Sequence, residues 1–208
     1  MAVTDRPRRR VLLLRHGQTE WSLSNQHTGR TDIDLTATGE QDATALRGIA
    51  ERIGLDGPYV IASPRRRAQR TAELAGLHVD ETSELFAEWD YGDYEGLTRK
   101  EIQATLEPGW MIWTHGARGG ESVAAMTARV DKAVHHVEER LRESDVVIVS
   151  HGHFSRSFVC RFLGWPIANG TSIDLRPAGS ALLIDTDADR RLAELRGPLG
   201  QWASAASI

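Results

Sequence analysis

Three short stretches of the chain carry arginine or histidine side chains that could act together on a charged group. They are Arg15-His16-Gly17, the run from Ser63 to Arg67, and Ser150-His151-Gly152. Guanidinium groups match the geometry of phosphate oxygens, and a neutral imidazole can attack phosphorus or donate a hydrogen bond. If the fold brings the three stretches together, their side chains are suited to a dianionic phosphate group.

Each stretch lies at the end of a short apolar run that is typical of a strand buried on both faces. The runs are residues 11–14, 59–62 and 145–150. Open parallel sheets bind ligands outside the carboxyl ends of their strands. The pattern therefore predicts an α/β fold in which the polar stretches meet at one edge of a parallel sheet.

Helices are predicted where apolar residues recur every three or four positions. A first helix is expected from Thr36, its N-cap, to about Gly54,. A second is expected to begin with Ser63 as the N-cap and Pro64 as the first helical residue,. Further helices are expected at 98–106, 121–142 and 154–163, and late strands, antiparallel or at an edge, at 181–185 and 192–195.

The composition argues against several classes of partner. The chain has 208 residues, and its 25 Lys plus Arg against 29 Asp plus Glu give a formal net charge of −4. This balance offers no large basic surface for nucleic acid or an anionic membrane. No segment approaches the roughly 20 apolar residues that span a bilayer. A homo-oligomer stays open, because an apolar helix face can cover either a sheet or a neighbouring subunit.

The length favours a single domain over residues 1–208, with a core at about 10–196 and short mobile termini that include residues 6–10,. Cys160 is the only cysteine, so neither an intramolecular disulfide nor a thiolate metal cage can form,. It falls in an apolar helical pattern and is expected to be an inert core residue. Together with the lack of a visible export signal, this predicts a cytoplasmic protein.

The three stretches and a fourth, acidic segment resemble the histidine phosphatase superfamily, in its phosphoglycerate-mutase-like branch 1. The likeness covers about residues 11–195. It rests on Arg-His-Gly at 15–17, Ser-Pro-x-x-Arg-Ala at 63–68, an acidic segment at 87–97 and Ser-His-Gly-His at 150–153. The resemblance implies a three-layer α/β/α sandwich with a mostly parallel central sheet. The chain looks most like actinobacterial broad-specificity acid phosphatases, and like a fungal sugar bisphosphatase.

The resemblance implies roles for five residues. His16 would be the nucleophile that becomes phosphorylated, and Glu88 would protonate the leaving oxygen. Arg15, Arg67 and His151 would stabilise the charge on the transferring phosphoryl group. After transfer, water activated by the same carboxylate would release inorganic phosphate.

A second set of residues is expected to contact the substrate. Ser22 stands where the family has an asparagine, so one phosphate contact differs in this chain. Arg99 lies eleven positions beyond Glu88 and is expected to reach the anionic end of the substrate. The full set is Gln18, Ser22, Thr28, Gly29, Tyr91, Arg99 and Gly152.

No metal and no cofactor is expected. His135 and His136 lie within a predicted helix, where adjacent side chains point apart. His151 is better used in phosphoryl transfer than as a metal ligand, and its neighbour His153 is expected to stay out of contact with phosphate.

These residues predict a metal-independent acid phosphatase that hydrolyses small phosphorylated metabolites through a phosphohistidine. The same core residues occur in related enzymes with other activities, so alternatives remain. They are a 2,3-bisphosphoglycerate-dependent phosphoglycerate mutase, a sugar bisphosphatase and a non-catalytic phosphate-binding module. Mutases tend to carry a longer insertion after the acidic segment, and this chain is short there, which favours hydrolysis.

Overall fold

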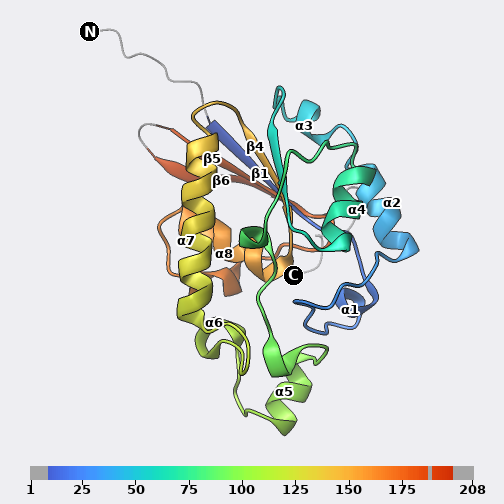
Figure 1. The fold of residues 1–208 in the computed structure, drawn as a ribbon, viewed down its shortest axis with the longest axis vertical. Helices are drawn as coiled ribbons and strands as arrows, with labels where there is room; N and C mark the ends of the chain where they lie inside the picture. The colour runs from blue at the N-terminus through green and yellow to red at the C-terminus, as the bar shows by residue number, and fades with distance from the viewer. Residues whose placement is uncertain (1–8, 187–188, 199–208) are drawn as a thin grey trace, which may run out of the picture.

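A six-stranded sheet forms the centre of the computed structural model, which describes residues 9–186 and 189–198 (Figure 1). The strands are β1 (Arg9–Arg15), β2 (Tyr59–Ala62), β3 (Glu81–Thr82), β4 (Val146–Ser150), β5 (Ser180–Asp185) and β6 (Arg190–Arg196). Their order across the sheet is β3-β2-β4-β1-β5-β6. The first four of these pair in parallel, whereas β5 runs antiparallel to both β1 and β6. The mostly parallel sheet and its late antiparallel strands agree with the prediction.

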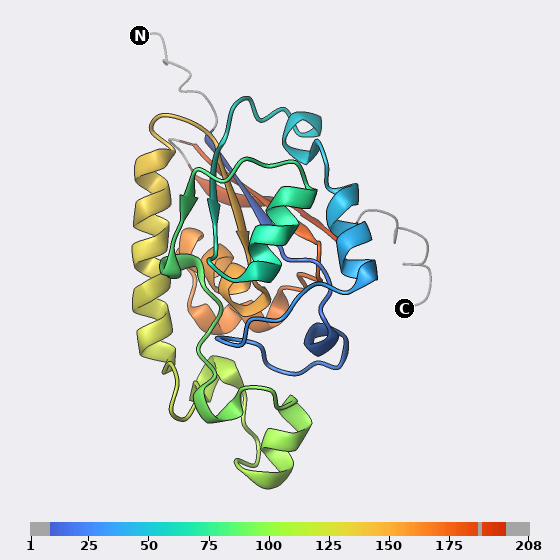
Figure 2. The ribbon, with the colours of Figure 1, turned by 45° about the vertical axis from the view of Figure 1, so that its right-hand side comes forward.

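Helices cover both faces of the sheet (Figures 1 and 2). One face carries α2 (Ala37–Ala45), α3 (Ile49–Arg52) and α4 (Arg66–Leu74), and the other carries α7 (Val123–Arg140) and α8 (Gly152–Phe162). Alternate strand residues supply two separate cores. Leu12 and Val147 pack with the first group of helices, whereas Leu13 and Ile148 pack with the second. Successive side chains of a strand point to opposite faces, and the predicted three-layer sandwich is confirmed.

The segment between β3 and α7 extends beyond the carboxyl ends of the central strands and is coloured green in Figures 1 and 2. It contains the 3-10 turns η1 (Glu84–Phe86) and η2 (Gly92–Tyr94) and the short helices α5 (Arg99–Thr105) and α6 (Ile112–His115). Two other short elements are α1 (Glu20–Leu23), after β1, and η3 (Ile167–Ser172), after α8. The predicted helix at 98–106 corresponds to α5.

Two helix boundaries differ from the prediction for local reasons. The helix expected at 36–54 begins at its predicted cap, Thr36, but Gly48 adopts a left-handed conformation, with φ of 72°, and separates α2 from α3. Glycine reaches this conformation without the steric cost that a Cβ would add. Helix α4 has Arg65 as its N-cap, so Ser63 and Pro64 precede the helix.

The predicted mobile N-terminus was wrong for Arg9 and Arg10. Both residues lie in β1, and the Arg10 guanidinium pairs with the Asp145 carboxylate at 2.6 Å. Residues 1–8 and 199–208, also predicted to be mobile, lie outside the described part of the chain. Cys160 is buried, as predicted, and burial raises the pKa of its thiol to about 11.

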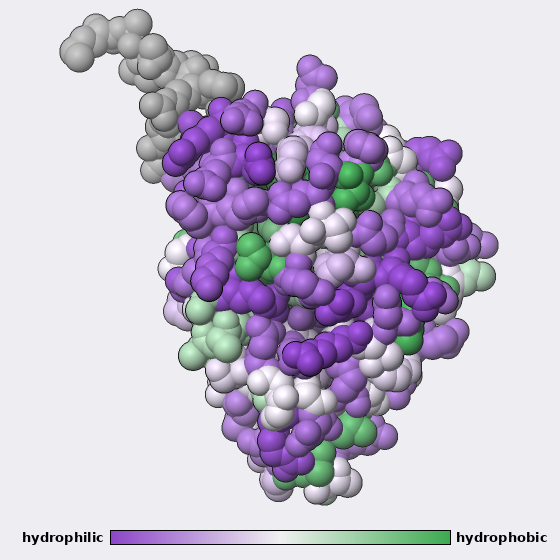
Figure 3. Space-filling view, viewed as in Figure 1, coloured by the Kyte–Doolittle hydropathy of each residue, from purple (hydrophilic) through white to green (hydrophobic). Residues whose placement is uncertain are grey.

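The surface is predominantly hydrophilic on the face drawn in Figure 3, with apolar residues scattered among polar ones. Among the described residues, the large apolar side chains that are exposed lie far apart in the sequence: Leu23, Leu106, Trp165 and Leu195. None of the described helices combines the length and the apolar character that crossing a bilayer requires,.

Candidate active site

A cavity of about 210 Å³ lies where β1 ends and α8 begins. We call it the inner cavity. It is at the carboxyl edge of the sheet, where the sequence pattern predicted a ligand site. Its lining residues are Arg15, His16, Ser22, Asn25, Gln26, His27, Thr28, Glu88, Tyr91, Gly152, His153 and Arg156.

His16 presents a neutral ring with a defined tautomer. Its Nδ1 lies 2.7 Å from the carbonyl oxygen of Gly17. A carbonyl can only accept, so Nδ1 carries the hydrogen and Nε2 keeps its lone pair. Burial, with the nearby positive charges of Arg67 and Arg15, holds the pKa of His16 well below 6.5. The lone pair that a nucleophile needs is therefore available at neutral and mildly acidic pH.

The backbone after β1 is fixed by a close approach to α2. A Cβ built on Gly17 would lie 2.4 Å from the carbonyl oxygen of Gly39, and real Cβ atoms do not come so near. The Gly17 N–H donates to Thr71 Oγ1 of α4 at 3.0 Å, and the His16 N–H donates to the Ser150 carbonyl of β4 at 2.9 Å. The loop that holds the candidate nucleophile therefore packs against α2 and is hydrogen-bonded to α4 and β4.

Arg15 has hydrogen-bonding capacity left over for an anion. Its Nη1 donates to the Leu175 carbonyl at 2.8 Å, but its Nε is buried without a partner in the described structure. Burial lowers the pKa of its guanidinium, although arginine stays charged in proteins. Gly152 makes room for this side chain, because a Cβ there would lie 3.0 Å from Arg15 Cζ.

Glu88 is a buried carboxylate at the N-terminus of α8. Its Oε1 accepts hydrogen bonds from the backbone N–H groups of Phe154, at 2.8 Å, and Trp89, at 2.9 Å. Its Oε2 accepts from the N–H of His153 at 2.9 Å. The N-cap residue of α8, His151, makes no side-chain capping bond. Glu88 therefore caps the helix from another segment while it lines the inner cavity.

Arg67 and His151 contact residues of the inner cavity but are not among those that line it. Both side chains are fully buried. Arg67 Nε donates to His151 Nδ1 at 3.2 Å, and its terminal nitrogens donate to the carbonyls of Thr28, Gly29 and Thr31. Most of the Arg67 guanidinium is thus occupied by protein groups.

The partners of His151 define its tautomer as well. Because Arg67 can only donate, His151 Nδ1 must accept, and its Nε2–H donates to Ser63 Oγ at 2.7 Å,. Burial and the charge of Arg67 hold the pKa of His151 well below 6.5. The His16 and His151 rings lie 5.2 Å apart between centroids, at 63° to each other. His151 therefore packs beside the candidate nucleophile as a neutral ring.

The predicted substrate-contacting residues divide into two groups. Ser22, Thr28, Tyr91 and Gly152 line the inner cavity. Burial and the charge of Glu88 raise the pKa of Tyr91 well above its ordinary value, so its hydroxyl stays protonated and lies 2.6 Å from His153 Nδ1. The Ser22 hydroxyl is engaged with the backbone N–H and carbonyl of Thr19 in a capping box,.

The second group does not line the inner cavity. The Gln18 side-chain oxygen accepts from Thr36 Oγ1 at 2.9 Å, which ties the loop to the start of α2. The Gly29 carbonyl accepts from Arg67, and its N–H donates to Glu95 Oε1 at 2.8 Å. Arg99 is exposed and lines an adjacent cavity.

Five residues of the inner cavity were not predicted to belong to the site: Asn25, Gln26, His27, His153 and Arg156. The last three also line the adjacent cavity, of about 240 Å³, which we call the outer cavity. His153 lies on this wall, and its lack of contact with phosphate stays a prediction. His153 and Arg156 share the first turns of α8 with Gly152, and that spacing was the sequence signal for both,.

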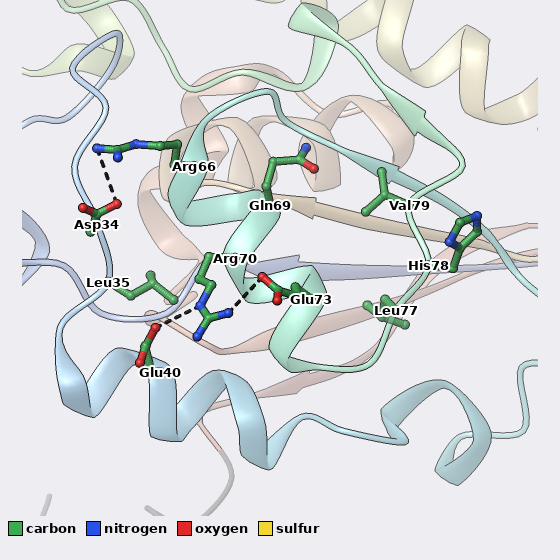
Figure 4. A pocket seen from close by; sticks show the side chains of 10 residues that line it. All are labelled: Asp34, Leu35, Glu40, Arg66, Gln69, Arg70, Glu73, Leu77, His78 and Val79. Atoms are coloured by element: carbon green, nitrogen blue, oxygen red, sulfur yellow. Dashed lines mark hydrogen bonds and ion pairs between the residues drawn. The ribbon is translucent and has the colours of Figure 1, made fainter.

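A larger cavity, of about 530 Å³, lies between α4 and the start of α2 (Figure 4). It is open, and its charged groups are already paired. Arg70 contacts both Glu40 and Glu73 at 2.9 Å, and Arg66 contacts Asp34 at 3.4 Å. Across the described residues, no three His, Cys, Asp or Glu side chains cluster as a metal site would require.

Comparison with known proteins identifies the family. The model of the histidine phosphatase superfamily, branch 1, matches residues 11–196. The chain belongs to this superfamily. An acid phosphatase of Mycobacterium tuberculosis is 46% identical over 89% of this chain and 91% of its own length. A solved structure from the same organism, also 46% identical, superposes with a TM-score of 0.87 and covers 90% of this chain and 97% of that one.

Other histidine phosphatases are less similar. A 2,3-bisphosphoglycerate-dependent phosphoglycerate mutase of Bartonella henselae is 34% identical over 75% of this chain and 82% of its own length. The predicted family, fold and enzyme class, a phosphatase of this superfamily, are confirmed.

Proposed function

We propose that this histidine phosphatase hydrolyses phosphate monoesters of small metabolites through a phosphohistidine at His16. The observation that carries the proposal is one cavity that combines a neutral imidazole, a partly unpaired guanidinium and a carboxylate, on His16, Arg15 and Glu88. These groups supply a nucleophile, a stabiliser of phosphate charge and a proton carrier. A binding module would have no need of the proton carrier.

In the first step, the Nε2 lone pair of His16 attacks phosphorus and the bond from phosphorus to the leaving oxygen breaks. Arg15 stabilises the charge on the phosphoryl oxygens, while Glu88 gives its proton to the leaving alkoxide. The hydrogen bond from Nδ1 to the Gly17 carbonyl stabilises the positive charge that forms on the ring.

In the second step, a water molecule attacks the phosphohistidine on the face that the alcohol has left. The Glu88 carboxylate takes one proton from this water, the bond from phosphorus to Nε2 breaks, and His16 returns to its neutral tautomer. Inorganic phosphate is the second product. No step calls for a metal ion or a bound cofactor, since the charges are supplied by Arg15 and Glu88.

Arg67 and His151 act in this proposal as positioning residues. Arg67 fixes the His151 ring and the backbone of residues 28–31, of which Thr28 lines the inner cavity. The resemblance predicts that His151 contacts phosphate. For this contact, the His151 ring would have to rotate so that its Nε2–H leaves Ser63 Oγ. The freed Nε2–H would then donate a hydrogen bond to the phosphoryl group during transfer.

Small substrates and a cytoplasmic location complete the proposal. The inner cavity, of about 210 Å³, accommodates a phosphate with a small alcohol rather than a protein segment,. The 46% identity to an acid phosphatase favours hydrolysis over phosphoryl transfer to a second substrate. A buried, unreactive Cys160 suits a reducing compartment,.

Para-nitrophenyl phosphate with excess EDTA at about pH 5 to 6 provides the test. We expect phosphate release by the wild type and its loss in His16→Ala, together with an acid-labile, alkali-stable phosphoryl group on His16 after rapid quenching. Persistent turnover by His16→Ala would contradict the proposal.

A second assay separates hydrolase from mutase. We expect 3-phosphoglycerate to be hydrolysed, with no isomerisation to 2-phosphoglycerate when 2,3-bisphosphoglycerate is added. Isomerisation faster than phosphate release would identify a mutase instead.

A further inference from the structure

Arg156 lies on the wall between the inner and outer cavities. We propose that it binds a second anionic group, a carboxylate or a second phosphate, carried by the leaving alcohol. This makes Arg156 a specificity residue and makes doubly anionic phosphate esters the preferred substrate class. The inference rests on the proposed function and adds to it the identity of the leaving group.

Two contacts hold the Arg156 guanidinium in place. Its Nε donates to the carbonyl of Gly170 at 2.7 Å, and its Cζ lies 4.8 Å from the centre of the Trp113 ring. The residue is on α8, one turn after Gly152, so both face the inner cavity,. A side chain anchored by a hydrogen bond and by stacking loses little entropy when it binds a ligand.

The terminal nitrogens of Arg156 are available. In the described part of the chain, they take part in no hydrogen bond and no ion pair, whereas Arg67 uses its own on three carbonyls. Arg161, five residues further along α8, is paired with Asp131 at 2.6 Å. A partly buried guanidinium without a carboxylate partner is costly, and a bound anion would offset that cost.

The surroundings assign Arg156 to the leaving group rather than to the transferring phosphate. Arg15 and His16 already serve the inner cavity, and neither lines the outer one. The described residues of the outer cavity include Arg99 and Arg156 and no carboxylate. An anion on the leaving alcohol would therefore meet a positive field as it crosses the shared wall.

The same wall offers neutral groups for hydroxyls of the alcohol. His27 Nδ1 lies 2.7 Å from the Leu97 carbonyl, so Nδ1 carries the hydrogen and Nε2 is an acceptor,. The Trp110 and Trp113 rings close the outer cavity with apolar surface. A short hydroxylated chain that ends in an anionic group would use the Arg156 guanidinium for its anion, the His27 acceptor for a hydroxyl and the two tryptophan rings for its carbon atoms.

Two substrate pairs that differ only in the second anion provide the test. In the first pair, 3-phosphoglycerate is compared with glycerol 3-phosphate, which has a hydroxymethyl group where the first has a carboxylate. In the second, fructose 1,6-bisphosphate is compared with fructose 1-phosphate. We expect the wild type to prefer the doubly anionic member of at least one pair, and the responding pair distinguishes a carboxylate from a phosphate.

The variants are Arg156→Met, Arg156→Lys and a control, Arg161→Met, on the same helix but lining neither cavity. We expect Arg156→Met to lose about tenfold or more in kcat/KM on the preferred doubly anionic ester, mainly through KM, and far less on its partner. Arg156→Lys should recover part of the preference, and Arg161→Met should keep all of it.

Equal losses on both members of each pair would overturn the inference, since they would place Arg156 on the transferring phosphate or in the fold. Unchanged kinetics in Arg156→Met would overturn it as well. Failure of the proposed function gives a separate result, because the wild type would then form no phosphohistidine with any of the four esters.

Discussion

At the scale of residues, the protonation of His16 is set by its immediate neighbours. One carbonyl holds Nδ1–H, and burial with two arginines holds the pKa of the ring well below 6.5. Protonation of the nucleophile therefore does not limit the reaction until the pH is well below that value.

The low pKa of His16 predicts that phosphohistidine formation persists when the pH is lowered from about 7 to 5,. Rapid quenching in alkali, in which phosphohistidine is stable, measures this formation across the pH range. An acid limb centred near 6.5, the ordinary pKa of histidine, would contradict the buried position of His16.

A second residue-scale prediction concerns Gly152. A Cβ at this position would lie 3.0 to 3.2 Å from three atoms of the Arg15 guanidinium, so Gly152→Ala should displace that group. We expect KM to rise about tenfold, the effect of weakening one charge-assisted hydrogen bond. Alanine also favours helix at the first position of α8, so the melting temperature should not fall. A KM equal to that of the wild type would show that the Arg15 guanidinium moves aside without losing its contact with the substrate.

At the scale of elements, α8 depends on Glu88 for its first turn. Glu88→Gln keeps an oxygen acceptor but cannot supply a proton, whereas Glu88→Ala removes both functions. We expect Glu88→Gln to slow alkyl phosphates about 100-fold, with a smaller effect on para-nitrophenyl phosphate, whose leaving group needs no proton.

The two variants should differ in stability. Glu88→Ala should lower the free energy of unfolding by about 1 to 2 kcal/mol, and Glu88→Gln by less. Denaturant titration measures this difference, which would be zero if Glu88 did not cap the helix.

The sequence predicts well those strands and helices in which the positions of apolar residues follow from which face of the element is buried. The strand at 146–150 is buried throughout, and α7 shows apolar residues at every third or fourth position. The break at Gly48 escaped prediction because a single left-handed glycine overrides the helical spacing on either side. The pattern of apolar residues does not report such local backbone geometry.

The candidate site was predictable only where a motif marks it. The motifs bring His16, Arg15 and Glu88 to one cavity, as the resemblance implied. The motifs do not indicate that the Arg67 guanidinium donates hydrogen bonds to carbonyl groups within residues 28–31. Those contacts depend on how the loop folds over α4. Arg156 belongs to none of the quoted motifs. Its spacing of four residues from Gly152 places both on one face of α8, but its position between two cavities appears only in three dimensions,.

At the scale of the whole molecule, a group of buried neutral histidines links the site to stability. Burial and nearby positive charges lower the pKa values of His16, His151 and His153 well below 6.5. Below that pH the unfolded chain binds protons that the folded chain does not. Folding stability is therefore lost as the pH falls below about 6.5, and the loss ends only below the folded-state pKa values.

We predict that the free energy of unfolding decreases between about pH 7 and 5, by up to about 1.4 kcal/mol per pH unit for each such histidine. Chemical denaturation at several pH values measures the slope. His153→Gln should reduce the slope, whereas His135→Gln, at a side chain that is 70% exposed, should leave it unchanged. Equal slopes in all three proteins would contradict the burial argument for His153.

In the proposed mechanism, the Glu88 side chain gains and loses a proton once in each turnover. While it carries the proton, one of its oxygens is a weaker acceptor for the N–H groups of His153 and Phe154. When the proton leaves with the alcohol, these hydrogen bonds regain their strength. Arg156 lies on the same helix, so the proposed contact of Arg156 with the leaving alcohol is coupled to the proton on Glu88 through the first turn of α8.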